Sequence, residues 1–247
     1  MKTKLIRIGE AAEILGVSID TLRRWDNCGK LLSIRIDANG HRYYRFSDIE
    51  FMLNSMQNQR NFAKKWVESK QGFELPLEVY CKTRDVFQVR LESLKLKLSK
   101  IFPQNAVVSL VIAIVGEIGN NSFDHNLGNW SDIVGVFFHY DRKKQTIILA
   151  DRGQGILTTL KRVRPELDNA KKALEVAFTE IISGRYPEVR GNGLKFVKSV
   201  VMNNPFSLWF QTENFCLHLK QNDQSFLIQQ TDSIVRGCFA TIKIEKK

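Results

Sequence analysis

Residues 117–126 read EIGNNSFDHN and directly follow the apolar run VVSLVIAIVG. The run favours a buried helix that continues into the polar stretch. Asn and Asp commonly cap helices, so the stretch alone fits a helix that leaves the core. It also fits a polar stripe aimed into a site, because Glu117 and Asn121 lie four residues apart and share a helix face. Asp124 and His125 continue that face by one turn. The rest of the chain has to decide between the two interpretations.

Composition places the chain among ordinary globular proteins. Its 247 residues, 43% hydrophobic, can build a buried core in one large domain or two smaller ones. A net charge of +11 favours anionic partners such as nucleic acid or nucleotide phosphates, although a solvated basic surface gives the same number. The four cysteines form no CxxC pair, which predicts neither disulfides nor a zinc site and fits a reducing cytoplasm. We expect no membrane segment.

Three segments follow from the pattern along the chain. Residues 1–57 predict a small domain, because apolar residues in GEAAEILGVSIDTLRRWD recur at helical spacing on both sides of a break at Gly16 and Val17. Two alternating stretches joined by Asn39 and Gly40 then predict a hairpin, or wing. Residues 58–80 are polar, with a Gly and a Pro, and predict a linker. Residues 81–247 form the second predicted domain.

The first segment has the pattern of a DNA-binding winged helix-turn-helix. Leu22 and Trp25 would pack one side of the second helix, which leaves the other side polar and basic for the major groove. Basic residues on the wing would contact phosphates without reading sequence. The predicted DNA-binding residues are Ser18, Thr21, Arg23, Arg24, Arg42, Tyr44 and Arg45.

The stretch TLRRWDNCGKLLSIRIDANGHRYYRF resembles the winged helix-turn-helix of the MerR and excisionase-like group. The resemblance covers about the first fifth of the chain and implies DNA contacts from the second helix and the wing. A long dimerising helix is not evident after the wing, so a homodimer stays open. A module retained for protein contacts is the alternative.

The second segment predicts helices followed by a largely antiparallel sheet. An amphipathic helix is expected over 85–102, two strands over 133–151, and strand-like runs between 207 and the end of the chain. This order predicts the α+β class, with the winged domain followed by a two-layer α/β sandwich.

Two glycine motifs lie downstream of the opening stretch. DRGQGI at 151–156 joins a strand end to paired glycines, and GNGL at 191–194 precedes a helix. Glycine allows the backbone to approach a ligand closely, and the helix start offers unpaired amides to phosphate. Each glycine pair alone is weak evidence for a ligand site.

In this order, EIGNNSFDHN, DRGQGI and GNGL resemble the N box and the two glycine boxes of the GHKL ATP-binding superfamily, which has the Bergerat-type fold. The resemblance covers about residues 85–247. It implies ATP and Mg²⁺ as cofactors, Asn121 as a metal ligand, and a mobile lid between the glycine boxes. The residues that it implies for cofactor binding are Asn121, Asp124, Asp151, Gly153, Gly155, Gly191, Gly193, Leu194 and Lys195. Asp151 would accept a hydrogen bond from the adenine amino group. In the lid, the candidate phosphate contacts are Lys161, Arg185 and Arg190.

Glu117 is the predicted catalytic residue. Hydrolysis needs a group that orients or deprotonates water, and Glu117 lies one helical turn before the expected metal ligand. In the superfamily a glutamate here marks ATPases and also anti-sigma kinases, where it activates a serine. His125 is expected to be a helix-end or lining residue.

These features predict an ATP-binding, Mg²⁺-dependent ATPase that binds DNA as a regulator of transcription. Its nucleotide state would switch its affinity for DNA or for a protein partner. Two alternatives remain: an anti-sigma-type serine kinase recruited through its first domain, and a regulator that binds ATP without hydrolysing it.

Overall fold

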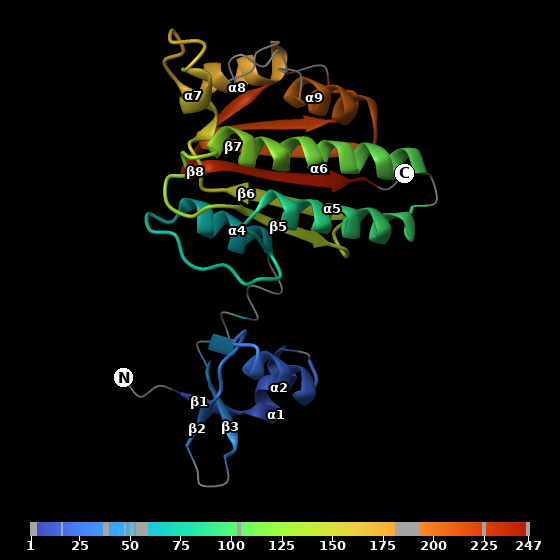
Figure 1. The fold of residues 1–247 in the computed structure, drawn as a ribbon. Coiled ribbons are helices and arrows are strands. Elements are labelled where there is room, and N and C mark those ends of the chain that lie inside the picture. The colour runs from blue at the N-terminus through green and yellow to red at the C-terminus, as the bar shows by residue number, and fades with distance from the viewer. Residues whose placement is uncertain are drawn as a thin grey trace. The chain divides into compact units, whose positions relative to one another are not determined.

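A computed structural model describes most of the chain, with short gaps (Figure 1). The described residues are 4–15, 17–36, 40–46, 48–49, 52, 59–102, 105–180, 193–223 and 226–245. The chain divides into two compact units, Met1–Phe62 and Ala63–Lys247.

The first unit combines two crossed helices with a small sheet. Its elements are β1 (Leu5–Arg7), α1 (Ile8–Leu15), α2 (Ile19–Asn27), β2 (Ile34–Arg35) and β3 (Arg42–Arg45). The sheet is antiparallel in the order β1-β3-β2, and the β2–β3 pair is the expected wing. Ser18 caps α2, because its Oγ accepts a hydrogen bond from Thr21 N at 3.1 Å. Leu22 and Trp25 of α2 are buried in the core of this unit.

The segment expected as a linker contains regular structure. Helix α4 (Gln59–Glu68) occupies part of it, and β4 (Tyr80–Cys81) begins at its end. Phe62, Ala63, Trp66 and Val67 are all buried and share one face of α4. The polar residues of the segment lie around this apolar stripe, so composition alone suggested a linker. The boundary between the two units falls within α4.

The second unit is a layer of helices on a five-stranded antiparallel sheet (Figure 1). Its further elements are α5 (Arg84–Ser99), α6 (Asn105–Asn126), β5 (Val136–Asp141), β6 (Thr146–Asp151), α7 (Gly155–Leu160), α8 (Ala170–Thr179), α9 (Gly193–Asn203), β7 (Phe206–Lys220) and β8 (Ile228–Ile244). The strand order is β4-β5-β6-β8-β7, and every described pair is antiparallel. The predicted fold class is therefore confirmed.

Helix α6 lies at the centre of the core. Val111, Ile114 and Val115 are fully buried, in one cluster with residues of α5, α8, α9 and the sheet. Among the described helices, only α6 is long and apolar enough to cross a membrane, over Ala106–Asn126. A core helix passes the same test, and the packing of α6 is that of a core helix.

Strand β7 covers two of the expected strand-like runs and bends between them. Trp209 and His218 have ring centroids 5.9 Å apart, although an extended chain would separate them by about 30 Å. Glu213 has a positive φ of 47°, and the register with β8 shifts at this residue. The bend brings Thr212 to the end of the sheet where Asp151 also lies.

Candidate functional site

The polar end of α6 forms one wall of a cavity. The other walls come from the end of β6, from α7, from the start of α9 and from β7 and β8. The lining residues are Ile118, Asn121, Ser122, His125, Asn126, Leu149, Ala150, Asp151, Gly155, Ile156, Thr159, Leu194, Phe210, Cys238 and Ala240. The three motifs, far apart in the sequence, therefore meet at one cavity with a largely apolar lining and a few polar groups, as is typical of small-molecule sites.

Asp151 is the most constrained polar residue of the cavity. Its side chain is buried at the end of β6. Its Oδ2 accepts a hydrogen bond from Ser122 Oγ at 2.8 Å, and its Oδ1 accepts one from Gly153 N at 2.9 Å. Asn126 Nδ2 adds a longer contact at 3.5 Å. Burial raises the pKa of Asp151 to about 6, because it disfavours the charged form more than these hydrogen bonds favour it.

This raised pKa predicts a pH dependence of stability. Because Asp151 has a higher pKa in the folded protein than its ordinary 3.8, its contribution favours the folded state below pH 3.8 and is lost as the pH rises through about 6. We expect the free energy of unfolding of the wild type, relative to Asp151→Asn, to fall by about 2 kcal/mol between pH 4 and pH 7. Urea unfolding of both proteins at the two pH values measures it. Parallel pH profiles of the two proteins would contradict the assignment.

Asn126 and Ser122 hold the glycine loop against α6. Asn126 Nδ2 donates to Ser122 O at 2.7 Å, and Asn126 Oδ1 accepts from Gln154 N at 2.8 Å. A methyl group on Gly153 would overlap the Asn126 amide, 2.0 Å from Nδ2. Gly153 therefore allows the loop to pack directly on α6, although it does not line the cavity itself.

Glu117 and Asn121 lie beside the start of α9, and of these two only Asn121 lines the cavity. A methyl group on Gly193 would lie 2.5 Å from Glu117 Oε2 and 3.6 Å from Asn121 Nδ2. An alanine at this position would require the Glu117 carboxylate to shift. The structure thus brings together Glu117, Asn121 and Gly193, which the sequence had placed in two separate motifs.

Several predicted site residues lie elsewhere. Asp124 forms an ion pair with Arg84 at the start of α5 and does not line the cavity. Lys195 lines a second, more open depression with residues of α8 and α9, including Lys198. Lys161 is exposed and does not line the cavity. Gly191, Arg185 and Arg190, together with most of the expected second half of the lid, lie outside the described residues.

Sequence reasoning missed a group of residues around Asp151. Ser122 and Asn126 stood in the opening stretch at helical spacing, so their shared face could have identified them. Gly237 has a φ of +71° and approaches Asp151 so closely that a methyl group there would lie 2.3 Å from Asp151 O. Burial raises the pKa of the Cys238 thiol well above its ordinary value, so Cys238 lines the cavity as a neutral thiol. These two residues belong to a late strand that carried no polar motif.

In the first unit, the predicted DNA-binding residues separate into exposed and buried groups. Arg23 and Arg24 are exposed on α2, and Arg23 forms an ion pair with Asp20 at 2.9 Å. Arg45 is also exposed. Thr21 is half-buried, and the Ser18 hydroxyl, besides capping α2, lies 3.0 Å from the Thr21 hydroxyl.

Two wing residues have structural contacts. The prediction of Tyr44 as a DNA contact needs correction, because Tyr44 is fully buried and its hydroxyl donates to Leu22 O at 3.4 Å. Strand alternation turns Tyr44 inward. Arg42 is half-buried, with Nε 2.7 Å from Asp26 Oδ2. Burial would raise the pKa of Asp26, but hydrogen bonds from Ser33 and Arg42 outweigh it and lower this pKa. Arg42 therefore ties the wing to the end of α2.

Comparisons with known proteins agree with these features. Residues 7–44 match the model of the MerR family regulatory protein. A stretch of 59 residues is 46% identical to the type II methyltransferase M.Eco47II of Escherichia coli, over 24% of this chain and 13% of that protein. The chain thus spans only a small part of the length of this relative.

Two solved structures are similar to parts of the chain. The 43K ATPase domain of Thermus thermophilus gyrase B, in complex with an aminocoumarin, is similar over 63% of this chain and 39% of that chain, with 16% identity and a TM-score of 0.36. The ATP-binding domain of Francisella tularensis topoisomerase IV, in complex with a small-molecule inhibitor, is similar over 52% of this chain and 34% of that chain, with 15% identity and a TM-score of 0.32. Residues 7–44 are thus a helix-turn-helix domain of the MerR family, joined in one chain to a two-layer α/β sandwich.

Proposed function

We propose that the second unit binds and hydrolyses ATP with Mg²⁺, and that the first unit binds DNA in a manner that depends on the bound nucleotide. One observation carries the ATP site. A single cavity is lined by the buried carboxylate of Asp151, by Asn121 of α6 and by Leu194 in the first turn of α9. Glu117 does not line the cavity, but its carboxylate lies beside Gly193 at the start of the same helix. A base-binding group together with phosphate-binding groups is what a nucleotide requires.

The Asp151 end suits a purine base. Leu149, Ala150, Ile156, Phe210 and Ala240 give this part of the cavity an apolar lining. A flat, poorly hydrated ring gains by leaving water for such a lining. The Asp151 carboxylate would accept a hydrogen bond from the exocyclic amine of adenine, which identifies the base.

The other end suits phosphates and a magnesium ion. Helix α9 begins at Gly193, where backbone amides without helical partners favour anions. Among the described residues, no group of three or more His, Cys, Asp and Glu side chains is placed to hold a metal. Mg²⁺ fits this donor set nonetheless, because it needs few protein oxygens when water and phosphate complete its coordination. Asn121 would supply its side-chain oxygen, and the bound ion would neutralise phosphate charge.

Glu117 would orient and deprotonate the attacking water. Its carboxylate lies beside the helix start that would hold the phosphates, so a water between them could donate a proton to it. Among the described residues, the only carboxylate that lines the cavity is that of Asp151, and hydrogen bonds from Ser122 and Gly153 hold it in place.

Incubation with ATP labelled on the γ-phosphate tests this function against its alternatives. Free labelled phosphate in the presence of Mg²⁺ is the expected result. Label transferred to a serine of a partner protein would instead identify a kinase. Saturable binding with neither product would identify a non-hydrolysing regulator, and no binding at all would contradict the ATP site.

The exposed face of α2 predicts the DNA contacts. We expect Arg23→Ala combined with Arg24→Ala to weaken DNA binding. Because each arginine would neutralise one phosphate, the slope of the logarithm of the binding constant against the logarithm of the salt concentration should also become shallower by about two. A gel-shift titration at several salt concentrations measures both effects.

The matched control for this pair is Lys171→Ala combined with Lys172→Ala on α8. These exposed lysines lie in the second unit, and their removal changes the net charge by the same amount. Equal weakening by both pairs would mean that net charge alone drives binding, and would contradict α2 as the DNA-binding surface.

A further inference from the structure

Arg152 lies next to Asp151 in the sequence but belongs to a different set of contacts. It is fully buried, the only charged side chain among the described residues with no exposed surface. Neighbouring residues at the end of a strand point to opposite faces of the sheet. Asp151 therefore faces α6 and the cavity, whereas Arg152 faces away from them, toward the segment that follows α4.

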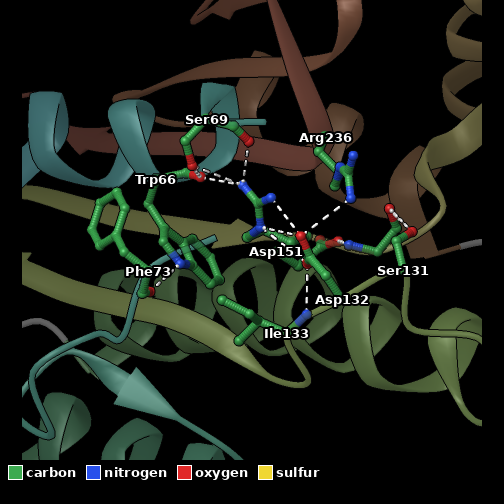
Figure 2. A network of polar contacts seen from close by, with 10 residues as sticks. Trp66, Ser69, Phe73, Ser131, Asp132, Ile133, Asp151 and Arg236 are labelled. Carbon is green, nitrogen blue, oxygen red and sulfur yellow. Dashed lines mark hydrogen bonds and ion pairs between the residues drawn. The ribbon is translucent and has the colours of Figure 1, made fainter. Parts of the chain in front are cut away.

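Two kinds of partner hold the Arg152 guanidinium (Figure 2). Its Nε and Nη2 donate to the Asp132 carboxylate, at 3.0 Å and 2.5 Å. Its Nη1 donates to three oxygen atoms, Trp66 O, Ser69 O at 3.0 Å and Ser69 Oγ at 3.2 Å. The guanidinium thus joins the loop after α6 to residues 66–73, which we call the strap.

The strap packs closely around the arginine. The Trp66 ring lies 5.8 Å from the guanidinium carbon, and its Nε1 donates to Phe73 O at 3.1 Å, which closes the strap on itself. A methyl group on Gly72 would lie 2.9 Å from Arg152 Nε. A buried arginine needs all its donors satisfied, so the position of the guanidinium and the docking of the strap depend on each other.

The backbone of Arg152 is equally fixed on the cavity side. Gly153 N donates to the Asp151 carboxylate, and Gly153 O accepts from Ser131 Oγ at 3.3 Å. Any ligand that engages the Asp151 carboxylate therefore acts on the peptide units on both sides of Arg152. The Arg152 side chain would carry such a shift to the strap, because its guanidinium donates hydrogen bonds directly to Trp66 O and Ser69 O.

We propose that Arg152 is a positioning residue that couples nucleotide binding at Asp151 to docking of the strap. By reciprocity, a docked strap favours the bound nucleotide as much as the nucleotide favours docking. The strap begins in the last turn of α4, and the boundary between the two units falls within that helix. The coupling therefore supplies a route by which nucleotide state reaches the segment that enters from the DNA-binding unit. The proposed coupling rests on the proposed ATP site.

Hydrogen exchange with and without a non-hydrolysable ATP analogue and Mg²⁺ tests the coupling on the full chain. In the wild type, we expect the analogue to slow amide exchange in 151–156 and, by about tenfold or more, in 66–73. Exchange in the wild type alone shows whether the strap responds to the analogue. If 151–156 responds and 66–73 does not, the coupling is overturned while the ATP site stands. If equilibrium binding of the analogue fails, the ATP site is overturned, and the coupling with it.

Arg152→Lys is the decisive variant. Lysine keeps the charge beside Asp132, but its three donors sit on one nitrogen, so it cannot reproduce the whole set of contacts that the three guanidinium nitrogens make with Asp132 and the strap. We expect exchange in 66–73 to rise about tenfold without nucleotide and to lose its response to the analogue, while 151–156 still responds. A wild-type response of the strap in this variant would overturn the proposal.

Arg236→Lys is the matched control, because Arg236 contacts the same Asp132 carboxylate at 3.1 Å and is partly exposed. The same chemical change there should leave the response of the strap at the wild-type level. Loss of the response in both variants would assign the effect to Asp132 and would overturn the role of Arg152.

Discussion

Glu117→Gln is expected to lower ATP-dependent phosphate release by about 10²–10⁴-fold, while ATP binding changes little. Glutamine has nearly the shape of glutamate but cannot accept a proton from water. The side chain lies beside Gly193 at the start of α9, where we propose that the phosphates bind, and it does not contact Asp151 among the described hydrogen bonds. Its neutralisation should therefore affect the chemical step and spare recognition of the base. Phosphate release under saturating ATP, together with equilibrium binding of ATP, measures the two effects separately.

Glu175→Gln is the matched control for this prediction. Glu175 is exposed on α8 and does not line the cavity, and the substitution removes the same charge. Its phosphate release should match that of the wild type. An unchanged rate in Glu117→Gln would remove Glu117 as the base. An equal loss of binding and turnover would instead make Glu117 a ligand-binding residue.

The site could be predicted from the sequence where polar residues interrupt apolar elements. Asn121 and Asp151 each stand at the end of an apolar run, and Gly193 opens a helix, so each position carried a local signal. The order of the motifs then indicated that they meet. Asp124 carried the same kind of signal, but it forms an ion pair with Arg84 at the start of α5.

The prediction for Tyr44 was wrong because a shift of one residue along a strand decides whether a side chain is buried or exposed. Tyr43 and Tyr44 are adjacent and chemically alike, and a shift of one position exchanges inside and outside on a strand. The pairing of β1 with β3 sets Tyr44 opposite Ile6, which is also buried. Strand β1 was not anticipated in the sequence, so the register of the wing could not be fixed.

The Arg152 network had no sequence signal at all. Its acceptors on the strap are mainly backbone oxygens, which every residue type supplies. Trp66 lay in a segment whose Lys and Glu content suggested a linker, although the apolar stripe of α4 was present at helical spacing. Long-range contacts to main-chain groups become visible only in the folded structure.

Gly237→Ala is expected to destabilise the second unit by about 3–5 kcal/mol and to weaken ATP binding. The backbone of Gly237 has a φ of +71°, which costs an alanine about 1–2 kcal/mol. The added methyl group would lie 2.3 Å from Asp151 O, 2.4 Å from Asp151 Oδ1 and 2.6 Å from Gly153 N. These atoms belong to the backbone or to a buried carboxylate held by hydrogen bonds, so they cannot move away at low cost. Urea unfolding and ATP titration measure the two effects.

Gly128→Ala separates the contribution of the clash from that of the backbone conformation. Gly128 has nearly the same φ, +72°, but a methyl group there would meet no atom within 4 Å. We therefore expect it to cost only about 1–2 kcal/mol and to leave ATP binding intact. The difference between the two variants then measures how tightly β8 packs against Asp151. Equal destabilisation by both would mean that the strand end yields to the methyl group, and that Gly237 does not fix the position of the carboxylate.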